Sequence, residues 1–93
     1  MVRAKFTMTS YKTTQYPRAI DKAKPWSEEN KEIVEMRTLE FTPVYANNDP
    51  THENTKFWNA SPSGKIELGT VNPEAWKDFE LGKEYYVDFT IAK

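Results

Sequence analysis

Three neighbouring side chains could coordinate a metal ion. Asp49, His52 and Glu53 supply two carboxylates and an imidazole within five residues, and oxygen donors of this kind suit a hard cation. A simpler interpretation is that Asp49-Pro50-Thr51-His52 forms an Asx turn, in which the aspartate accepts a hydrogen bond from the backbone two residues on and the histidine is solvated. We favour the turn, and we expect no metal and no cofactor.

Other residue types offer little for catalysis. The chain has one histidine and no cysteine, and it has no glycine-rich phosphate loop or metal-binding motif. Ser61 and Ser63 have no base close to them in the sequence, and they belong to a turn. Asp88 alternates onto the polar face of a strand, where it is solvated or paired. The sequence therefore predicts a protein that is not an enzyme.

A set of basic and aromatic residues could bind single-stranded nucleic acid. Such proteins combine cationic groups that follow the phosphates with aromatic rings that stack on the bases. Candidates of both kinds lie in the first strand and the loop after it, namely Arg3, Lys5, Tyr11, Arg18 and Lys24. Residues 1–24 hold six basic groups and one acidic group (+5), and residues 25–93 hold seven and thirteen (−6), which gives −1. This asymmetry can mark an anion-binding side. Oppositely charged neighbouring strands would instead neutralise it, and dedicated nucleic-acid-binding domains are usually basic overall.

Three large aromatic residues are candidates for contact with a protein partner: Trp26, Tyr16 and Trp58. A tryptophan beside a proline in a long polar loop is typical of an interface anchor. Trp58 has the parity of Lys56, which places it on the outer face of a strand and would suit an edge-to-edge homodimer. Each residue also has a structural alternative. Tyr16 and Trp26 could fold the loop onto the sheet, and Trp58 could form a second layer of the core.

The hydropathy pattern predicts one mostly β domain over residues 1–93. Residues 2–11 alternate as a strand, with Ala4, Phe6 and Met8 on one face. Residues 12–30 contain two prolines and no sustained period, so they predict a long irregular loop. Residues 31–46 predict a strand that has a bulge near Arg37-Thr38 or bends across two faces of a barrel, and Pro43 indicates an edge at its far end.

The second half of the chain predicts a hairpin, a helix and a last strand. Residues 53–60 and 65–70 form the two arms of the hairpin, joined by the turn Ser61-Pro62-Ser63-Gly64. Asn72-Pro73 begins a helix of about two turns, and residues 83–92 form a strand that we expect to be central. The fold class is α+β, with about five strands in a twisted sheet or small open barrel and one short helix before the last strand.

Several motifs along the chain occur together in a known group of proteins. They are Arg3–Phe6, Val34–Met36, Pro43–Ala46, Glu53-Asn54, Ala60–Leu68, Val71–Pro73 and Phe79–Thr90. In this combination they resemble a family of small proteins of tailed bacteriophages, which typically carry a Thr/Ser-Pro-Ser-Gly turn and a final Gly-Lys-x-Tyr-Tyr-Val-Asp-Phe-Thr strand. The family has no assigned activity, so the resemblance implies a phage origin and no mechanism.

The functional expectation combines this origin with the residues. No apolar run approaches the length of a membrane span, no signal peptide is recognisable, and the absence of cysteine fits a reducing cytosol. The sequence thus predicts a non-enzymatic phage protein in the cytoplasm of the infected bacterium, which acts by binding a host or phage protein. The alternatives are a single-stranded nucleic-acid-binding protein, a ligand-sequestering protein or a virion component.

Overall fold

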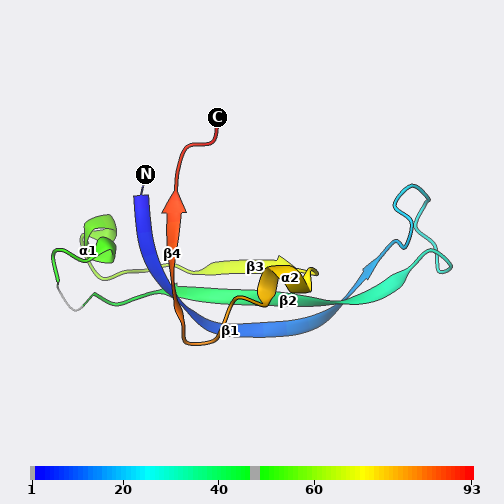
Figure 1. Ribbon diagram of the computed structural model, residues 1–93, viewed down its shortest axis with the longest axis horizontal. Coiled ribbons are helices and arrows are strands. Elements are labelled where there is room, and N and C mark those ends of the chain that lie inside the picture. Colours follow the sequence, from blue (N-terminus) through cyan, green and yellow to red (C-terminus); the bar gives the residue numbers. More distant parts are fainter. Residues whose placement is uncertain (1, 47–48) are drawn as a thin grey trace.

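The computed structural model describes residues 2–46 and 49–93. These residues form four strands and two short helices, in the order β1 (Val2–Arg18), β2 (Glu32–Pro43), α1 (Glu53–Trp58), β3 (Ile66–Thr70), α2 (Pro73–Trp76) and β4 (Glu84–Phe89). All strands pair antiparallel in a single sheet of order β3-β2-β1-β4 (Figure 1). The mostly β fold class is confirmed, with four strands in place of about five.

The molecule consists of a small body and a long arm. Residues 14–18 of β1 and 32–36 of β2 pair with each other and with no third strand. Together with the connection between them they form the arm, residues 14–36, which extends away from the other elements (Figure 1). The resulting extents are 58 × 33 × 20 Å and the radius of gyration is 17.9 Å, whereas a compact domain of this length has about 12 Å.

The core lies on one face of the sheet within the body. Its buried side chains come from β1, β2 and α2: Ala4, Phe6, Met8, Leu39, Phe41 and Trp76. Half-buried aromatic rings complete it, since Phe41 contacts both Phe79 and Tyr85, with ring centroids 5.6 and 5.9 Å apart. We call this side of the sheet the core face. The predicted inward positions of the first strand are confirmed.

A bulge occurs in β1 and not in β2. The register shifts between Met8, which pairs with Phe41, and Ser10, so that Tyr11 pairs with Leu39. The extra residue brings Tyr11 onto the core face, opposite to the face that simple alternation predicts. The bulge predicted near Arg37-Thr38 is wrong, because Arg37–Phe41 pair with β3 without a shift. β2 is an internal strand, and Pro43 ends it beyond its last pairing with β3.

The long irregular loop predicted at residues 12–30 is also shorter than expected. Residues 12–18 belong to β1 and pair with Glu32–Thr38, which leaves residues 19–31 as the connection. These arm strands bury no side chain, so their sequence lacks the alternation that marks a half-buried strand. Pro17 is accommodated because each arm strand has a neighbour on one side alone.

The hairpin predicted around residues 53–64 is wrong in its first half. Residues 53–58 form α1, with the His52 imidazole accepting a hydrogen bond from the Asn54 N–H at 3.0 Å. Asn59 ends the helix with φ of 55°, a conformation that Asn tolerates better than most residues. The strand β3 does form where expected, but it pairs with β2.

The last two elements agree with the sequence in part. Asn72 caps α2 by accepting from the Glu74 N–H at 3.1 Å, and Pro73 is the first helical residue. The helix ends at Trp76, before the expected two turns. Strand β4 forms, but it lies at an edge of the sheet and not at its centre.

Candidate functional site

The end of the arm is a compact loop organised by Asn30. The side-chain oxygen of Asn30 accepts from the Asp21 N–H at 2.8 Å, and its amide nitrogen donates to the carbonyls of Asp21 and Pro25 at 3.1 and 3.0 Å. The Asp21 carboxylate in turn accepts from the Ala23 N–H at 2.9 Å. A single side chain therefore ties together both sides of residues 19–31.

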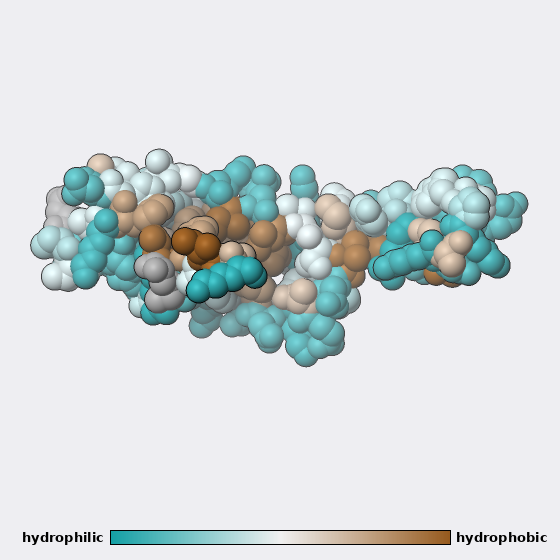
Figure 2. Space-filling model, turned by 90° about the horizontal axis from the view of Figure 1, so that it is seen from above, coloured by the Kyte–Doolittle hydropathy of each residue, from teal (hydrophilic) through white to brown (hydrophobic). Residues whose placement is uncertain are grey.

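The same loop presents large apolar side chains to solvent. Trp26 is 55% exposed, and Ile20 is exposed as well. Tyr16 and Ile33, on the paired strands of the arm, are also exposed, and apolar patches are visible among the hydrophilic side chains of the arm in Figure 2. The alternative in which Tyr16 and Trp26 fold the loop onto the sheet does not occur, because the arm holds both residues away from the core face.

Trp58 does not lie on the outer face of a strand, where its parity predicts it. It lies in α1, half-buried, and its ring meets Phe6 edge-on at 6.1 Å and Phe57 at 4.6 Å. Its indole N–H donates to the Ser63 carbonyl at 2.9 Å. Trp58 covers one end of the core, as its structural alternative required, although it does so from a helix.

Three of the four basic residues proposed for nucleic-acid binding, namely Arg3, Lys5 and Arg18, are paired with carboxylates. Arg3 makes a two-pronged contact to Asp88, at 2.7 and 3.1 Å, and this hydrogen bond lowers the pKa of the Asp88 carboxyl. Lys5 lies 3.9 and 3.8 Å from the carboxylates of Glu53 and Glu84. The neighbouring strands thus neutralise much of the basic first segment.

These residues are also spread along the molecule. Arg3 and Arg18 stand on the same strand fifteen residues apart, which corresponds to about 50 Å, and Arg18 pairs with Glu32 at 2.8 Å. Tyr11 lies on the core face, and the Arg37 guanidinium is 4.5 Å from the centroid of its ring. Lys24 lies in the end loop of the arm. The structure does not bring the five candidates together.

The Asx turn is confirmed, and it accounts for the candidate metal ligands. Asp49 accepts hydrogen bonds from the hydroxyl and N–H of Thr51, at 2.7 and 2.9 Å, and the hydroxyl is the larger cause of its lowered pKa. His52 caps α1 and is half-buried, whereas a solvated histidine is predicted. Within residues 2–46 and 49–93, no three His, Cys, Asp or Glu side chains are grouped to hold a metal.

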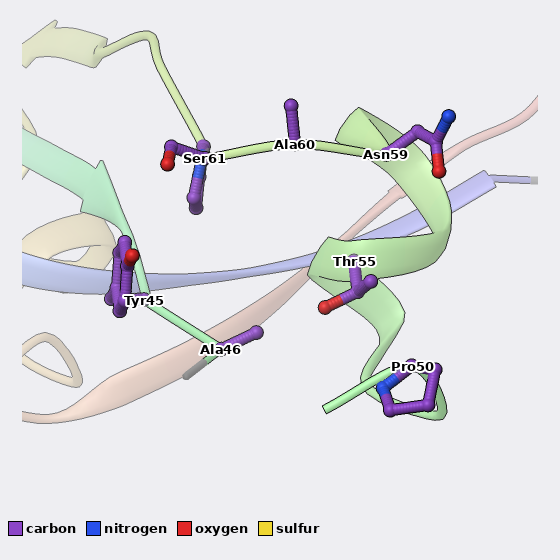
Figure 3. Close-up of a pocket in the computed structure, with 8 residues that line it drawn as sticks. Tyr45, Ala46, Pro50, Thr55, Asn59, Ala60 and Ser61 are labelled. Carbon is purple, nitrogen blue, oxygen red and sulfur yellow. The ribbon is translucent and has the colours of Figure 1, made fainter. Parts of the chain in front are cut away.

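A cavity of about 440 Å³ lies between the end of β2, α1 and the loop that follows the helix. Figure 3 shows the Thr55 hydroxyl directed into the space between α1 and Tyr45, and the Asn59 amide turned away from it. The lining residues are Tyr45, Ala46, Pro50, Thr55, Asn59, Ala60, Ser61 and Pro62. None of these side chains is charged, so the cavity offers neither an acid nor a base to a bound molecule.

Two residues have structural roles that the sequence does not predict. Asn54 is fully buried, and its amide accepts from the Lys5 N–H at 2.7 Å and donates to the carbonyls of Lys5 and Val44 at 2.8 Å. The Asn54 side chain thereby supplies hydrogen bonds to the backbone at the point where β2 ends and separates from β1. Arg37 is sandwiched between the rings of Tyr11 and Trp76, at 4.5 and 4.8 Å. Neither contact has a local sequence signal, because each depends on residues distant in the chain.

No protein-family model, curated protein or solved structure matches this chain. The resemblance to small phage proteins therefore stays a prediction. Among the described residues, no helix is long and apolar enough to cross a membrane.

Proposed function

We propose that this chain is a non-enzymatic phage protein that binds a host or phage protein in the infected bacterial cell, and that the end of the arm makes the contact. The observation that supports this most is the end loop itself. Its backbone is fixed by Asn30, and it presents Trp26 to solvent at a distance from the core. The phage origin is supported by the motifs named above.

A loop of this kind suits protein recognition. Tryptophan and tyrosine dominate the binding energy of many interfaces, and both types are exposed on the arm at Trp26 and Tyr16. A loop that is already ordered loses less conformational entropy when it binds. Since the arm buries no side chain of its own, its apolar residues contribute little to the core, and a binding role explains why they are there.

The charge of the arm favours a protein over nucleic acid. Residues 14–36 hold four basic and five acidic groups, which gives a net charge of −1. Affinity for nucleic acid comes largely from cations that neutralise phosphates, and the arm has no excess of them. Nucleic-acid binding through Arg3, Lys5, Tyr11, Arg18 and Lys24 is the weaker proposal, because these residues are dispersed and three of them pair with carboxylates.

The test is recovery of tagged protein from phage-infected cells, followed by native mass spectrometry. We expect a complex with one defined polypeptide. Trp26→Ala should weaken that complex at least about tenfold, which corresponds to the 1–2 kcal/mol typical of an interface anchor. Tyr45→Ala is the matched control, since Tyr45 is an equally exposed aromatic residue on the body.

A second variant tests the role of loop order. Asn30→Ala keeps Trp26 but removes the hydrogen bonds that fix the loop, so it should weaken the complex while the fold of the body persists by circular dichroism. Equal recovery of the polypeptide with wild type, Trp26→Ala and Asn30→Ala would refute the assignment to the arm. A co-purified oligonucleotide whose binding falls steeply with salt would favour nucleic acid instead. A small fixed mass per chain would favour ligand sequestration, and recovery with purified particles would favour a virion component.

A further inference from the structure

The outer edge of β4 has no neighbouring strand among the described residues. On its inner side β4 pairs with β1, and the Met8 N–H donates to the Lys83 carbonyl at 3.0 Å. Because ladder hydrogen bonds alternate along an antiparallel strand, the backbone groups of Glu84, Tyr86 and Asp88 point outward. The helices lie elsewhere, with α1 packed on β1 and α2 beside β3. The edge is therefore open to another strand.

Apolar residues continue along this edge beyond the end of β4. Val87 and Phe89 lie on the core face, since they pair with Ala4 and Val2. Ile91 has the same parity and is 91% exposed, and Phe89 is 52% exposed. Residues 90–93 lie beyond the end of β4 and, in the part of the chain that the structure describes, belong to no strand and have no strand beside them. A neighbouring strand would supply the missing hydrogen bonds and would cover both apolar side chains.

We propose that β4 pairs antiparallel with β4 of a second copy of this chain, about a two-fold axis at Phe89. The two four-stranded sheets then join edge to edge into one continuous sheet. Phe89 faces the partner subunit's Phe89, and Val87 faces the partner subunit's Ile91. Such isologous pairing uses the same surface on both copies, as closed dimers require.

The side chains that face each other select this register. A two-fold axis at Asp88 would place two carboxylates directly opposite each other, which is unfavourable. An axis at Val87 would place Ile91 opposite a lysine, the partner's Lys83. With the axis at Phe89, Asp88 and Tyr86 face the partner's Thr90 and the partner's Ala92, and neither of those residues is charged. Their outward backbone groups meet a complementary set, as they would about either other axis.

The acidic residues of β4 do not oppose this pairing. Asp88 is bonded to Arg3 at 2.7 Å, and Glu84 lies 3.8 Å from the Lys5 amine. Both carboxylates are thus neutralised within their own chain, on the face opposite the core. The core faces of the two copies lie on the same side of the joined sheet. An apolar groove of about 620 Å³, which runs between β3 and β4 and includes Phe41, Leu68 and Phe89, would then continue from one copy into the other.

Introduced cysteines test the register, because the chain has none of its own. On the two-fold axis, Phe89 would form a non-hydrogen-bonded pair with Cβ atoms about 5 Å apart, which is within reach of a disulfide. Phe89→Cys should therefore cross-link into a covalent dimer under mild oxidation. Asp88→Cys and Val87→Cys should not cross-link. Each of these positions lies two or four residues along the strand from the same position of the second copy, which is too far for a disulfide.

Sedimentation velocity on the purified chain tests the surface. We expect the chain to form a dimer when its concentration is raised to about 0.1 mM. Ile91→Glu should raise the dissociation constant of this dimer at least about tenfold. The matched control Ile33→Glu alters an exposed isoleucine on the arm and should leave the dimer intact. A wild-type monomer at these concentrations would overturn the proposal, as would a dimer insensitive to Ile91→Glu. Cross-linking at position 87 or 88 in place of 89 would overturn the register. These measurements use no infected cells, so they stand apart from the test of the arm.

Discussion

In the body, β1 buries Ala4, Phe6 and Met8, whereas in the arm the same strand buries no side chain between Thr14 and Arg18. The body is held by apolar side chains that pack on one face of the sheet. The arm is held by the ladder between its two strands and by hydrogen bonds from Asn30. The difference shows that one long hairpin has one part that packs the core and another part that contributes no buried side chain.

Removing a core ring should have the largest effect, and it should separate the two regions most clearly. Phe41 is buried and contacts the rings of Phe79 and Tyr85, so Phe41→Ala should lower the free energy of unfolding by about 3–5 kcal/mol. Tyr16→Ala, in the arm, should change it by no more than about 0.5 kcal/mol. Urea titrations followed by circular dichroism measure both, and comparable losses would contradict the division into body and arm.

A smaller but still large effect is expected at Asn54. Asn54→Ala leaves the part-buried Lys5 N–H and Val44 carbonyl without these partners, which should cost about 1–3 kcal/mol in total. Asn30→Ala is the matched asparagine in the arm, where the freed groups reach water. It should leave the free energy of unfolding within about 1 kcal/mol of wild type while hydrogen exchange over residues 20–26 becomes faster. If Asn30→Ala proved the more destabilising of the two, the arm would be part of the cooperative core.

A substitution at the junction between body and arm should lower the free energy of unfolding by an intermediate amount. Arg37 stacks between Tyr11 and Trp76, and cation–π contacts contribute about 0.5–1 kcal/mol each at partly exposed sites. The buried Nε–H of Arg37 has no hydrogen-bond acceptor among the described residues, so removing it offsets part of the lost cation–π energy. Arg37→Met should therefore cost about 1 kcal/mol and speed hydrogen exchange at the base of the arm. An unchanged exchange rate there would show that the stack does not anchor the arm.

The smallest expected effect is on how the melting temperature falls at acidic pH. The pKa of Asp88 is lowered by its hydrogen bond from Arg3, and that of Glu40 by the Ser10 hydroxyl and then by Lys65. A carboxyl with a lowered folded-state pKa contributes stability above its unfolded pKa, near pH 4. That contribution is lost as the pH falls through the folded value. Asp88→Asn should flatten the fall in melting temperature below about pH 4, and an unaltered profile would exclude the Arg3–Asp88 pair as a contributor.

The sequence predicted those elements that bury one face. Ala4, Phe6 and Met8 were identified because a half-buried strand alternates, and the start of α2 because Asn72-Pro73 is a strong local signal. The arm strands could not be found in this way, since neither face is buried. Residues 53–58 alternate by chance, and six residues are too few for hydropathy to distinguish a strand from a helix. The helix is marked by its N-cap, His52, which the sequence analysis assigns to a turn.

The candidate site was predicted by residue type more than by position. Trp26 and Tyr16 are exposed, in place of the alternative that folds them onto the sheet, and their contact with a partner stays a prediction. The loop around Trp26 was expected to be irregular, and its order comes from Asn30, whose hydrogen bonds reach five to nine residues back along the chain. Arg3, Lys5 and Arg18 find their carboxylate partners on other strands or across the hairpin, and only the folded register shows this.

The burial of Asn54 has a consequence for the order in which the chain folds. Its amide bonds to backbone groups of Lys5 and Val44, which lie side by side only after β1 and β2 have paired. Helix α1 is six residues long, too short to be stable alone, so it should dock after the transition state. Asn54→Ala should therefore accelerate unfolding and leave the folding rate nearly unchanged, a φ-value near zero. Stopped-flow measurements across urea concentrations would show this, and a slowed folding limb would instead place α1 in the nucleus.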